Sequence, residues 1–411
     1  MAGINGSGRF YTRFTDATAE GAQAGAAMKT HTLPLLRCLK LLPALVLLPW
    51  SLSAEPVKDR PVSDDEALVQ IALLLDTSNS MDGLIEQAKS QLWKIVNEFN
   101  DAQQHGKAAV VQVALYEYGN NNLSVGTNYI RLVQPFTRDL DTVSDHLFKL
   151  TTHGGQEYCG AVVREAVDRL AWEASPQVYK AIFIAGNEPF TQGTVNPNEA
   201  CRAALQRGIV VNTIHCGSQA AGESGGWRTG AALAEGKFMT INQDKAIVRL
   251  EAPQDKEIAR LSIELNKTYI SYGREGPRAE ANQLRQDENA AANAPAGASV
   301  QRALTKISRN YDSSSWDLVD AVKRKGVAPS SVKPEDLPKE YQQLDEAALQ
   351  KLVEEKSTER ERIQSEIKKL NEAREQFLAD KTREQGEADT LDAVIGKAVR
   401  EQAAKVKIEF K

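Results

Sequence analysis

The chain has 411 residues, of which 42% are hydrophobic and 26% are charged, and this composition is ordinary for a globular protein of two or three domains. The formal net charge is −5, and the sequence contains no basic stripe interleaved with aromatic residues. Composition and charge therefore exclude a typical nucleic-acid-binding protein.

Residues 1–54 have the features of a leader that ends in a secretory signal peptide. Basic residues around Arg37 precede the apolar run 41–50, and small residues follow up to Ala54. This order is typical of a signal peptide, and the apolar run is too short for a membrane span. We expect translation to start at Met28 and cleavage to follow Ala54, with an uncleaved anchor as the alternative. The mature protein would then be periplasmic or extracellular.

The segment LVQIALLLDTSNSM, which ends at Met81, is an apolar run that changes abruptly to polar side chains. Its apolar residues do not alternate with polar ones, which favours a central strand covered on both faces. Asp76, Ser78 and Ser80 follow at the carboxyl end, where open α/β sheets bind ligands. In an extended loop the three side chains point the same way, toward a hard cation. The alternative is a turn in which Ser78 or Ser80 only caps the next helix.

This D-x-S-x-S pattern resembles the metal-ion-dependent adhesion site of von Willebrand factor A (VWA) domains. The resemblance covers residues 67–249, behind a lead-in at 55–66. It implies a doubly wound, mostly parallel α/β sheet with a Rossmann-like order of elements. It also implies a divalent cation with an open coordination position, which an Asp or Glu carboxylate of a protein partner would complete. We therefore expect a binding or scaffolding protein and not an enzyme.

Hydrophobic periodicity predicts alternating strands and helices through this region. In chain order we expect a strand at 68–76, a helix at 81–99, strands at 108–118 and 129–136, helices at 139–150 and 161–172, a strand at 178–184, a helix at 199–207 and a strand at 208–214. Residues 231–241 resemble the last helix-to-strand passage of VWA domains.

Two loops of this region match the same family in part. The Gly-rich loop before the helix at 161–172 places Glu157 where a variant of the family has a carboxylate. After the strand at 178–184, Gly186 stands where relatives usually have an Asp, and Asn187 offers a neutral oxygen beside it. The resemblance thus implies weak binding of Mg²⁺, or of Mn²⁺ or Ca²⁺, because affinity follows the charge of the ligands. Alternatively, the glycines only supply a turn and Glu157 lies in solvent. The implied ligands are Asp76, Ser78, Ser80, Glu157 and Asn187.

The rest of the chain is expected to be helical. Residues 250–334 predict an accessory region of helices and linkers, and residues 335–411 predict a charged region with one long helix. Half of the residues 351–390 are charged, and Arg360 and Arg374 interrupt the apolar positions. These interruptions favour a solvated helix over a poor coiled coil.

Export would place three cysteines in an oxidising compartment. Three thiols allow one internal disulfide, and we expect Cys216 to pair with Cys159 or Cys201. The alternative function is an envelope hydrolase or thiol enzyme that uses Cys159, His153 and Cys216, but nothing in their spacing fixes a catalytic triad.

Overall fold

The structure is a computed structural model that describes residues 66–82, 94–241, 251–292, 297–385 and 391–410. The expected leader and signal peptide, and the middle of the helix expected at 81–99, lie outside these residues. None of the helices in the described ranges is both long and apolar enough to span a membrane.

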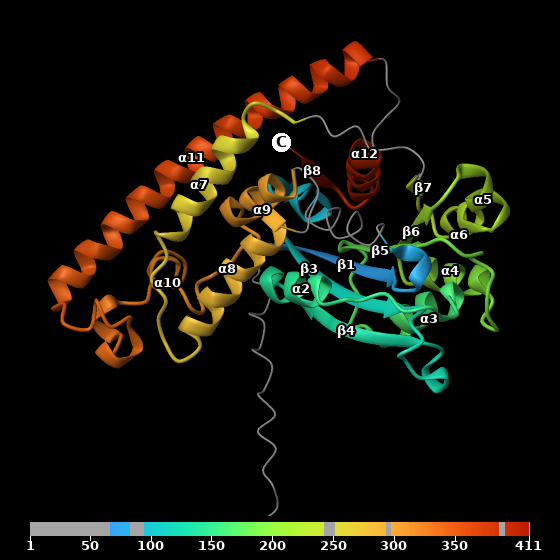
Figure 1. Ribbon diagram of the computed structural model, residues 1–411, viewed down its shortest axis with the longest axis horizontal. Coiled ribbons are helices and arrows are strands. Elements are labelled where there is room, and N and C mark those ends of the chain that lie inside the picture. Colours follow the sequence, from blue (N-terminus) through green and yellow to red (C-terminus); the bar gives the residue numbers. More distant parts are fainter. Residues whose placement is uncertain (1–65, 83–93, 242–250, 293–296, 386–390, 411) are drawn as a thin grey trace, which may run out of the picture. The chain divides into compact units, whose positions relative to one another are not determined.

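An eight-stranded sheet forms the framework of the VWA-like region (Figure 1). The strand order is β7-β6-β5-β1-β3-β2-β8, and β4 pairs with β3 beside this path. Strands β1, β3, β5, β6 and β7 pair in parallel, whereas the pairings of β2, β4 and β8 are antiparallel. The strands are β1 (Glu66–Asp76), β2 (Ala102–Gln104), β3 (Lys107–Tyr118), β4 (Ile130–Thr137), β5 (Tyr179–Gly186), β6 (Ile209–Cys216), β7 (Phe238–Ile241) and β8 (Ile408–Phe410).

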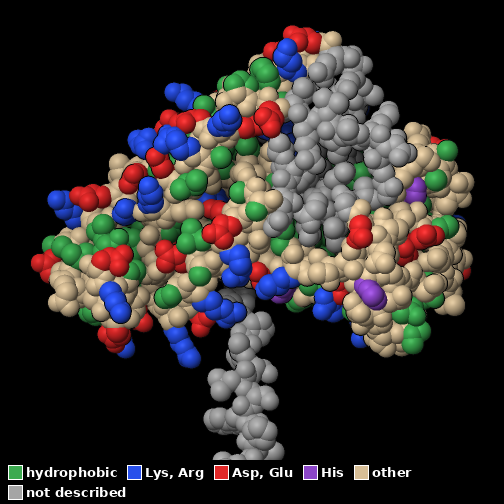
Figure 2. Space-filling model, in the orientation of Figure 1, with side chains coloured by type: hydrophobic (Ala, Val, Ile, Leu, Met, Phe, Trp, Pro, Cys, Tyr) green, Lys and Arg blue, Asp and Glu red, His purple; other side chains and the backbone are tan. Residues whose placement is uncertain are grey.

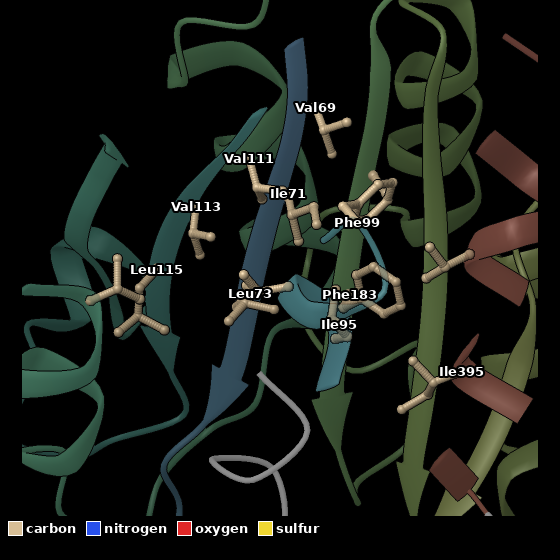
Figure 3. Close-up of a cluster of buried hydrophobic side chains, with 14 of the residues drawn as sticks. Val69, Ile71, Leu73, Ile95, Phe99, Val111, Val113, Leu115, Phe183 and Ile395 are labelled. Atoms are coloured by element: carbon tan, nitrogen blue, oxygen red, sulfur yellow. The ribbon is translucent and has the colours of Figure 1, made fainter. Parts of the chain in front are cut away.

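Helices cover both faces of the sheet. Successive residues of β1 point to opposite faces, so Ile71 and Leu73 enter one apolar cluster while Ala72 and Leu74 enter another. The first cluster also receives side chains from α2, α12 and the helical residues 94–97 (Figure 3). The second cluster is covered by α3, α4 and α6. Each fully buried aliphatic side chain contributes about 1.5–3 kcal/mol, so the central strand is held from both sides. The helices are α2 (Leu140–Phe148), α3 (Cys159–Arg169), α4 (Pro197–Gln206), α5 (Gln219–Ser224), α6 (Trp227–Leu233) and α12 (Leu391–Ala404).

This architecture confirms the expected doubly wound, mostly parallel sheet followed by a helical region. The elements expected between residues 108 and 214 are present, with ends that differ by a few residues. Hydrophobic periodicity does not predict β2 or β8, because three residues are too few to show a period of two.

The last described residues complete the core of the sheet. β8 pairs with β2, and α12 inserts Ile395 and Val399 into the first cluster. The Gln402 amide is buried: it accepts from Tyr179 Oη at 2.8 Å and donates to Asn212 Oδ1 at 2.7 Å. The C-terminal segment therefore belongs to the fold of the sheet, although α7 to α11 separate it from β7 along the chain.

The intervening helices form two further apolar clusters. The long helix α11 packs against α7, α9 and α10. The bounds are α7 (Asp255–Asn266), α8 (Gly276–Ala292), α9 (Ala298–Ile307), α10 (Leu318–Lys325) and α11 (Glu346–Gln385), with short 3-10 helices η1 (Asn79–Met81), η2 (Val125–Thr127), η3 (Pro329–Ser331) and η4 (Pro334–Asp336).

The expectation of a solvated α11 is wrong for one of its faces. Arg360 and Arg374, the two residues that interrupt the apolar positions, are themselves buried. Arg360 Nη1 lies 2.7 Å from Asp317 Oδ2, and Arg374 Nε lies 2.6 Å from Asp255 Oδ1. The opposite face of α11 is exposed, with acidic and basic side chains interspersed along it (Figure 2).

Candidate metal centre

Asp76 is the last residue of β1, and its carboxylate organises the loop that follows. The backbone N–H of Ser78 donates to Asp76 Oδ1 at 2.8 Å, which folds the chain back on the strand end. The hydroxyl oxygens of Ser78 and Ser80 are then 2.8 Å apart. Asp76 and Ser78 are buried, whereas Ser80 is exposed at the surface. The three side chains of the D-x-S-x-S motif therefore gather at one point, with access to solvent through Ser80.

Glu157 comes to the same point from the loop that precedes α3. Its Oε1 lies 3.5 Å from Ser80 Oγ, and its Oε2 accepts the backbone N–H of Glu188 at 3.3 Å. The Glu157 N–H donates to the Gln192 side chain at 2.6 Å. Glu157 is thus anchored at both its backbone and its carboxylate. It is 3% exposed, so it does not lie in solvent as the alternative expectation had it.

Asn187 closes the site from the loop after β5. With its amide nitrogen facing the carboxylates, it donates to Asp76 Oδ2 at 3.2 Å and to Glu157 Oε2 at 3.3 Å. Its oxygen then accepts from Ser80 Oγ at 3.1 Å. The structure therefore brings together all five side chains named from the sequence.

The two carboxyl groups lie together without a basic residue among the described ones to pair with them. Burial raises the pKa of Asp76 well above its usual value, and a hydrogen bond to the neighbouring Glu157 and its like charge raise it further. Among the described residues, the partners of Asp76 and Glu157 are backbone N–H groups, serine hydroxyls and the Asn187 amide, with no Lys or Arg. No group of three or more His, Cys, Asp or Glu side chains in the described part of the chain is placed to hold a metal. The site thus offers two acidic ligands and several neutral oxygens, and this donor set fits a hard divalent cation.

Two residues that sequence reasoning missed shape the site from the carboxyl end of β3, where Tyr118 is the last residue of the strand and Gly119 follows it. Gly119 has a φ of +79°, and a Cβ there would lie 2.6 Å from Asp76 Oδ1 and 2.9 Å from Glu157 Cγ. Tyr118, just before it, is fully buried and donates to the Ala185 carbonyl at 2.9 Å. The position of Gly119 directly after a buried strand is the sequence signal that could have identified it as a site residue. The ends of parallel strands meet at one edge of a sheet, where the site lies.

The cysteines do not form the expected disulfide. Cys159, Cys201 and Cys216 are all free and buried. Cys216 packs in the first cluster, and Cys159 and Cys201 pack in the second, on the other face of the sheet. The prediction that Cys216 pairs with either one is wrong, because β-strand backbone separates the thiols.

The same separation prevents Cys159 and Cys216 from acting together in one site. His153 makes its hydrogen bonds through its backbone, to Thr77 and Asn121. Burial raises the pKa of both thiols, which disfavours the nucleophilic thiolate. These residues therefore do not assemble the thiol centre considered from the sequence.

Comparison with known proteins gives one family match. Residues 70–233 match the model of the von Willebrand factor type A domain. A search of curated proteins found no match.

Several solved structures align with part of the chain. Proximal thread matrix protein 1 from the mussel byssus aligns over 45% of this chain and 44% of its own, with 18% identity and a TM-score of 0.33. BatB from Bacteroides thetaiotaomicron aligns over 42% and 90%, with 17% identity and a TM-score of 0.32. The SpRpn10 VWA domain aligns over 44% and 92%, with 14% identity and a TM-score of 0.35. The chain spans less than half of the mussel protein, and TM-scores this low carry no information on function.

Proposed function

The chain contains a von Willebrand factor type A domain, and we propose that this domain binds a protein partner outside the cytoplasm through a divalent cation. The observation that supports this proposal most directly is the pair of buried carboxylates, Asp76 and Glu157, which has no basic partner among the described residues. Two adjacent buried acids are costly unless a cation or a shared proton compensates them. A cation is the compensation that the surrounding hydroxyl and amide oxygens also support.

The proposed ligands divide into charged and neutral groups. Asp76 and Glu157 supply the charge, and Ser78 and Ser80 supply neutral oxygens. Asn187 would supply a third, because a cation in place of its hydrogen bonds to the carboxylates would favour the amide rotated so that the oxygen faces the ion. Two carboxylates hold an ion less tightly than three, so we propose weak binding of Mg²⁺, or of Mn²⁺ or Ca²⁺. When bound, the ion would supply an electrophilic attachment point for a carboxylate. The exposed Ser80 marks the side from which an Asp or Glu of the partner would approach.

Location outside the cytoplasm is a separate part of the proposal. It is supported by the order of basic, apolar and small residues up to Ala54. N-terminal sequencing of the protein from its native cells should find a mature chain that begins near Glu55. A cytosolic form that retains Met28 would contradict this part.

Thermal unfolding tests the cation. A ligand that binds only the folded state stabilises it by RT ln(1 + [L]/Kd), about 2.7 kcal/mol at a hundredfold excess over Kd. The protein should therefore melt at a higher temperature in millimolar Mg²⁺ or Mn²⁺ than in chelator. Asp76→Ala should remove this difference, whereas Glu335→Ala, at an exposed position, should keep it. Identical melting curves with and without cation for the unmodified protein would remove the ion from the proposal.

The partner is tested by affinity capture from envelope extract with the full mature chain. Proteins retained in Mg²⁺, released by chelator and absent from the Asp76→Ala column are the expected outcome. Retention that is equal in chelator would mean that the domain binds through its loops alone.

A further inference from the structure

Gly186 lies at the carboxyl end of β5, one residue before the site residue Asn187. The surrounding residues leave no room for a side chain at this position. A Cβ at this position would overlap the hydroxyl of Tyr118. It would also lie 3.1 Å from Trp227 Cη2 and 3.3 Å from the Cβ of Asp76. The space in which a side chain at 186 would face the carboxylate pair is therefore already filled, by a tyrosine from β3 and a tryptophan from α6.

Tyr118 is held rigidly in this place. It pairs in register with Asp76 across β3 and β1, and its ring reaches past β1 to β5. Its hydroxyl donates to the Ala185 carbonyl at 2.9 Å and lies 3.6 Å from Cys159 Sγ. The side chain is fully buried, so the hydroxyl has no solvent into which it could move to admit another group.

The same hydrogen bond fixes the loop that carries Asn187. Ala185 is two residues before Asn187, whose amide bridges Asp76 and Glu157 at 3.2 and 3.3 Å. Trp227 supports the other side of this loop, because its Nε1 donates to the Glu188 carbonyl at 2.8 Å. Tyr118 and Trp227 thus hold residues 185–188 in place by hydrogen bonds to both ends of this segment.

We propose that Tyr118 is the positioning residue that limits the site to two carboxylates: it keeps position 186 free of a side chain and holds Asn187 as the neutral third group. The part of this proposal that concerns cation affinity rests on the proposed function above. The steric part does not, so the two parts are tested by separate measurements.

A double-mutant cycle tests the steric part in chelator. Gly186→Ala should lower the melting temperature by at least about 2 °C, because overpacking of a close-packed interior is destabilising. In a Tyr118→Phe background, which lacks the overlapping hydroxyl, the loss caused by Gly186→Ala should fall to less than about half. Tyr116→Phe is the matched control, since Tyr116 is buried on the same strand and its hydroxyl has no hydrogen-bond partner in the described residues; it should not relieve the loss. Equal losses in all three backgrounds, or no loss in any, would overturn the proposal.

Mg²⁺ titration tests whether Tyr118 limits the number of carboxylates that the site can hold. The Tyr118→Phe/Gly186→Asp variant regains room for a third acid, so it should bind Mg²⁺ at least about tenfold more tightly than Tyr118→Phe. An unchanged Mg²⁺ affinity in this folded variant would overturn the role of Tyr118 in limiting charge. If no protein in the series responds to Mg²⁺, the proposed function fails, while the cycle in chelator still decides whether Tyr118 keeps position 186 empty.

Discussion

Arg302 Nη1 lies 2.6 Å from Asp141 Oδ1, and this buried ion pair joins α9 to α2. The Arg302 side chain is 1% exposed, and its Nε also lies 2.8 Å from Asp287 Oδ1 on α8. The Tyr311 hydroxyl donates to the second oxygen of Asp141 at 2.5 Å. The helices that follow the VWA domain are thus attached to it by charged groups from which water is excluded.

The first prediction follows from this attachment. Asp141→Ala should lower the free energy of unfolding by about 3 kcal/mol or more, because it leaves the buried Arg302 guanidinium short of one partner. The midpoint of urea unfolding measures this effect. Glu275→Ala, which breaks an ion pair between exposed side chains, should not shift the midpoint measurably. Equal midpoints for the two variants would mean that the ion pair does not stabilise the attachment.

The second prediction concerns the three thiols. Alkylation of the unfolded chain without reductant should modify Cys159, Cys201 and Cys216 together, because each is free. Alkylation of the folded chain should be slow, since all three are buried and burial raises the pKa of Cys201 to about 12. Mass spectrometry of the peptides distinguishes the two states. Two thiols that react only after reduction would establish a disulfide in the isolated protein.

Local patterns in the sequence were sufficient to predict the central strand and three of the five residues of the candidate site. Asp76, Ser78 and Ser80 lie within five residues of one another, so a short extended loop is enough to bring their oxygens together. Glu157 and Asn187 could be named only from the family resemblance, because they reach the site through the order of strands.

The missed features depend on contacts between distant segments. Gly119 contacts Asp76 only because β3 lies beside β1. Periodicity identifies Arg360 only as an interruption of an apolar face, because it does not reveal a buried partner such as Asp317. The disulfide expectation failed for a related reason: position at one edge of a sheet does not specify the face toward which a thiol points.

The third prediction compares two glycines with nearly the same backbone conformation. Gly119 and Gly106 have φ values of +79° and +78°, but a Cβ at 106 would meet no atom within 4 Å. Gly106→Ala should therefore cost only the strain of a positive φ, about 1–2 kcal/mol. Gly119→Ala should cost about 1–3 kcal/mol more, because it overlaps the Asp76 and Glu157 side chains. Urea unfolding of both variants checks the difference, and equal losses would argue against close packing at the site.

The last prediction is the dependence of stability on pH. The pKa of Asp76 is raised in the folded chain above its value of 3.8 in an unfolded chain, chiefly by burial and then by Glu157. Between these two pKa values the folded state binds more protons than the unfolded state, so in chelator this group makes the protein less stable as pH rises. Asp76→Asn should remove that loss and should melt at a higher temperature than the unmodified protein at neutral pH in chelator.

Mg²⁺ should oppose this dependence. The cation competes with the proton for the Asp76 carboxylate, so the gain in melting temperature from millimolar Mg²⁺ should be largest at neutral pH and should shrink as pH falls toward the native pKa of Asp76. Melting temperatures measured between about pH 5 and 8, with Mg²⁺ and with chelator, separate the two slopes. Asp76→Asn is the control, because it keeps the oxygen that accepts the Ser78 N–H but carries no charge. A gain from Mg²⁺ that is constant across this range, or that persists in Asp76→Asn, would place the bound ion somewhere other than on this carboxylate.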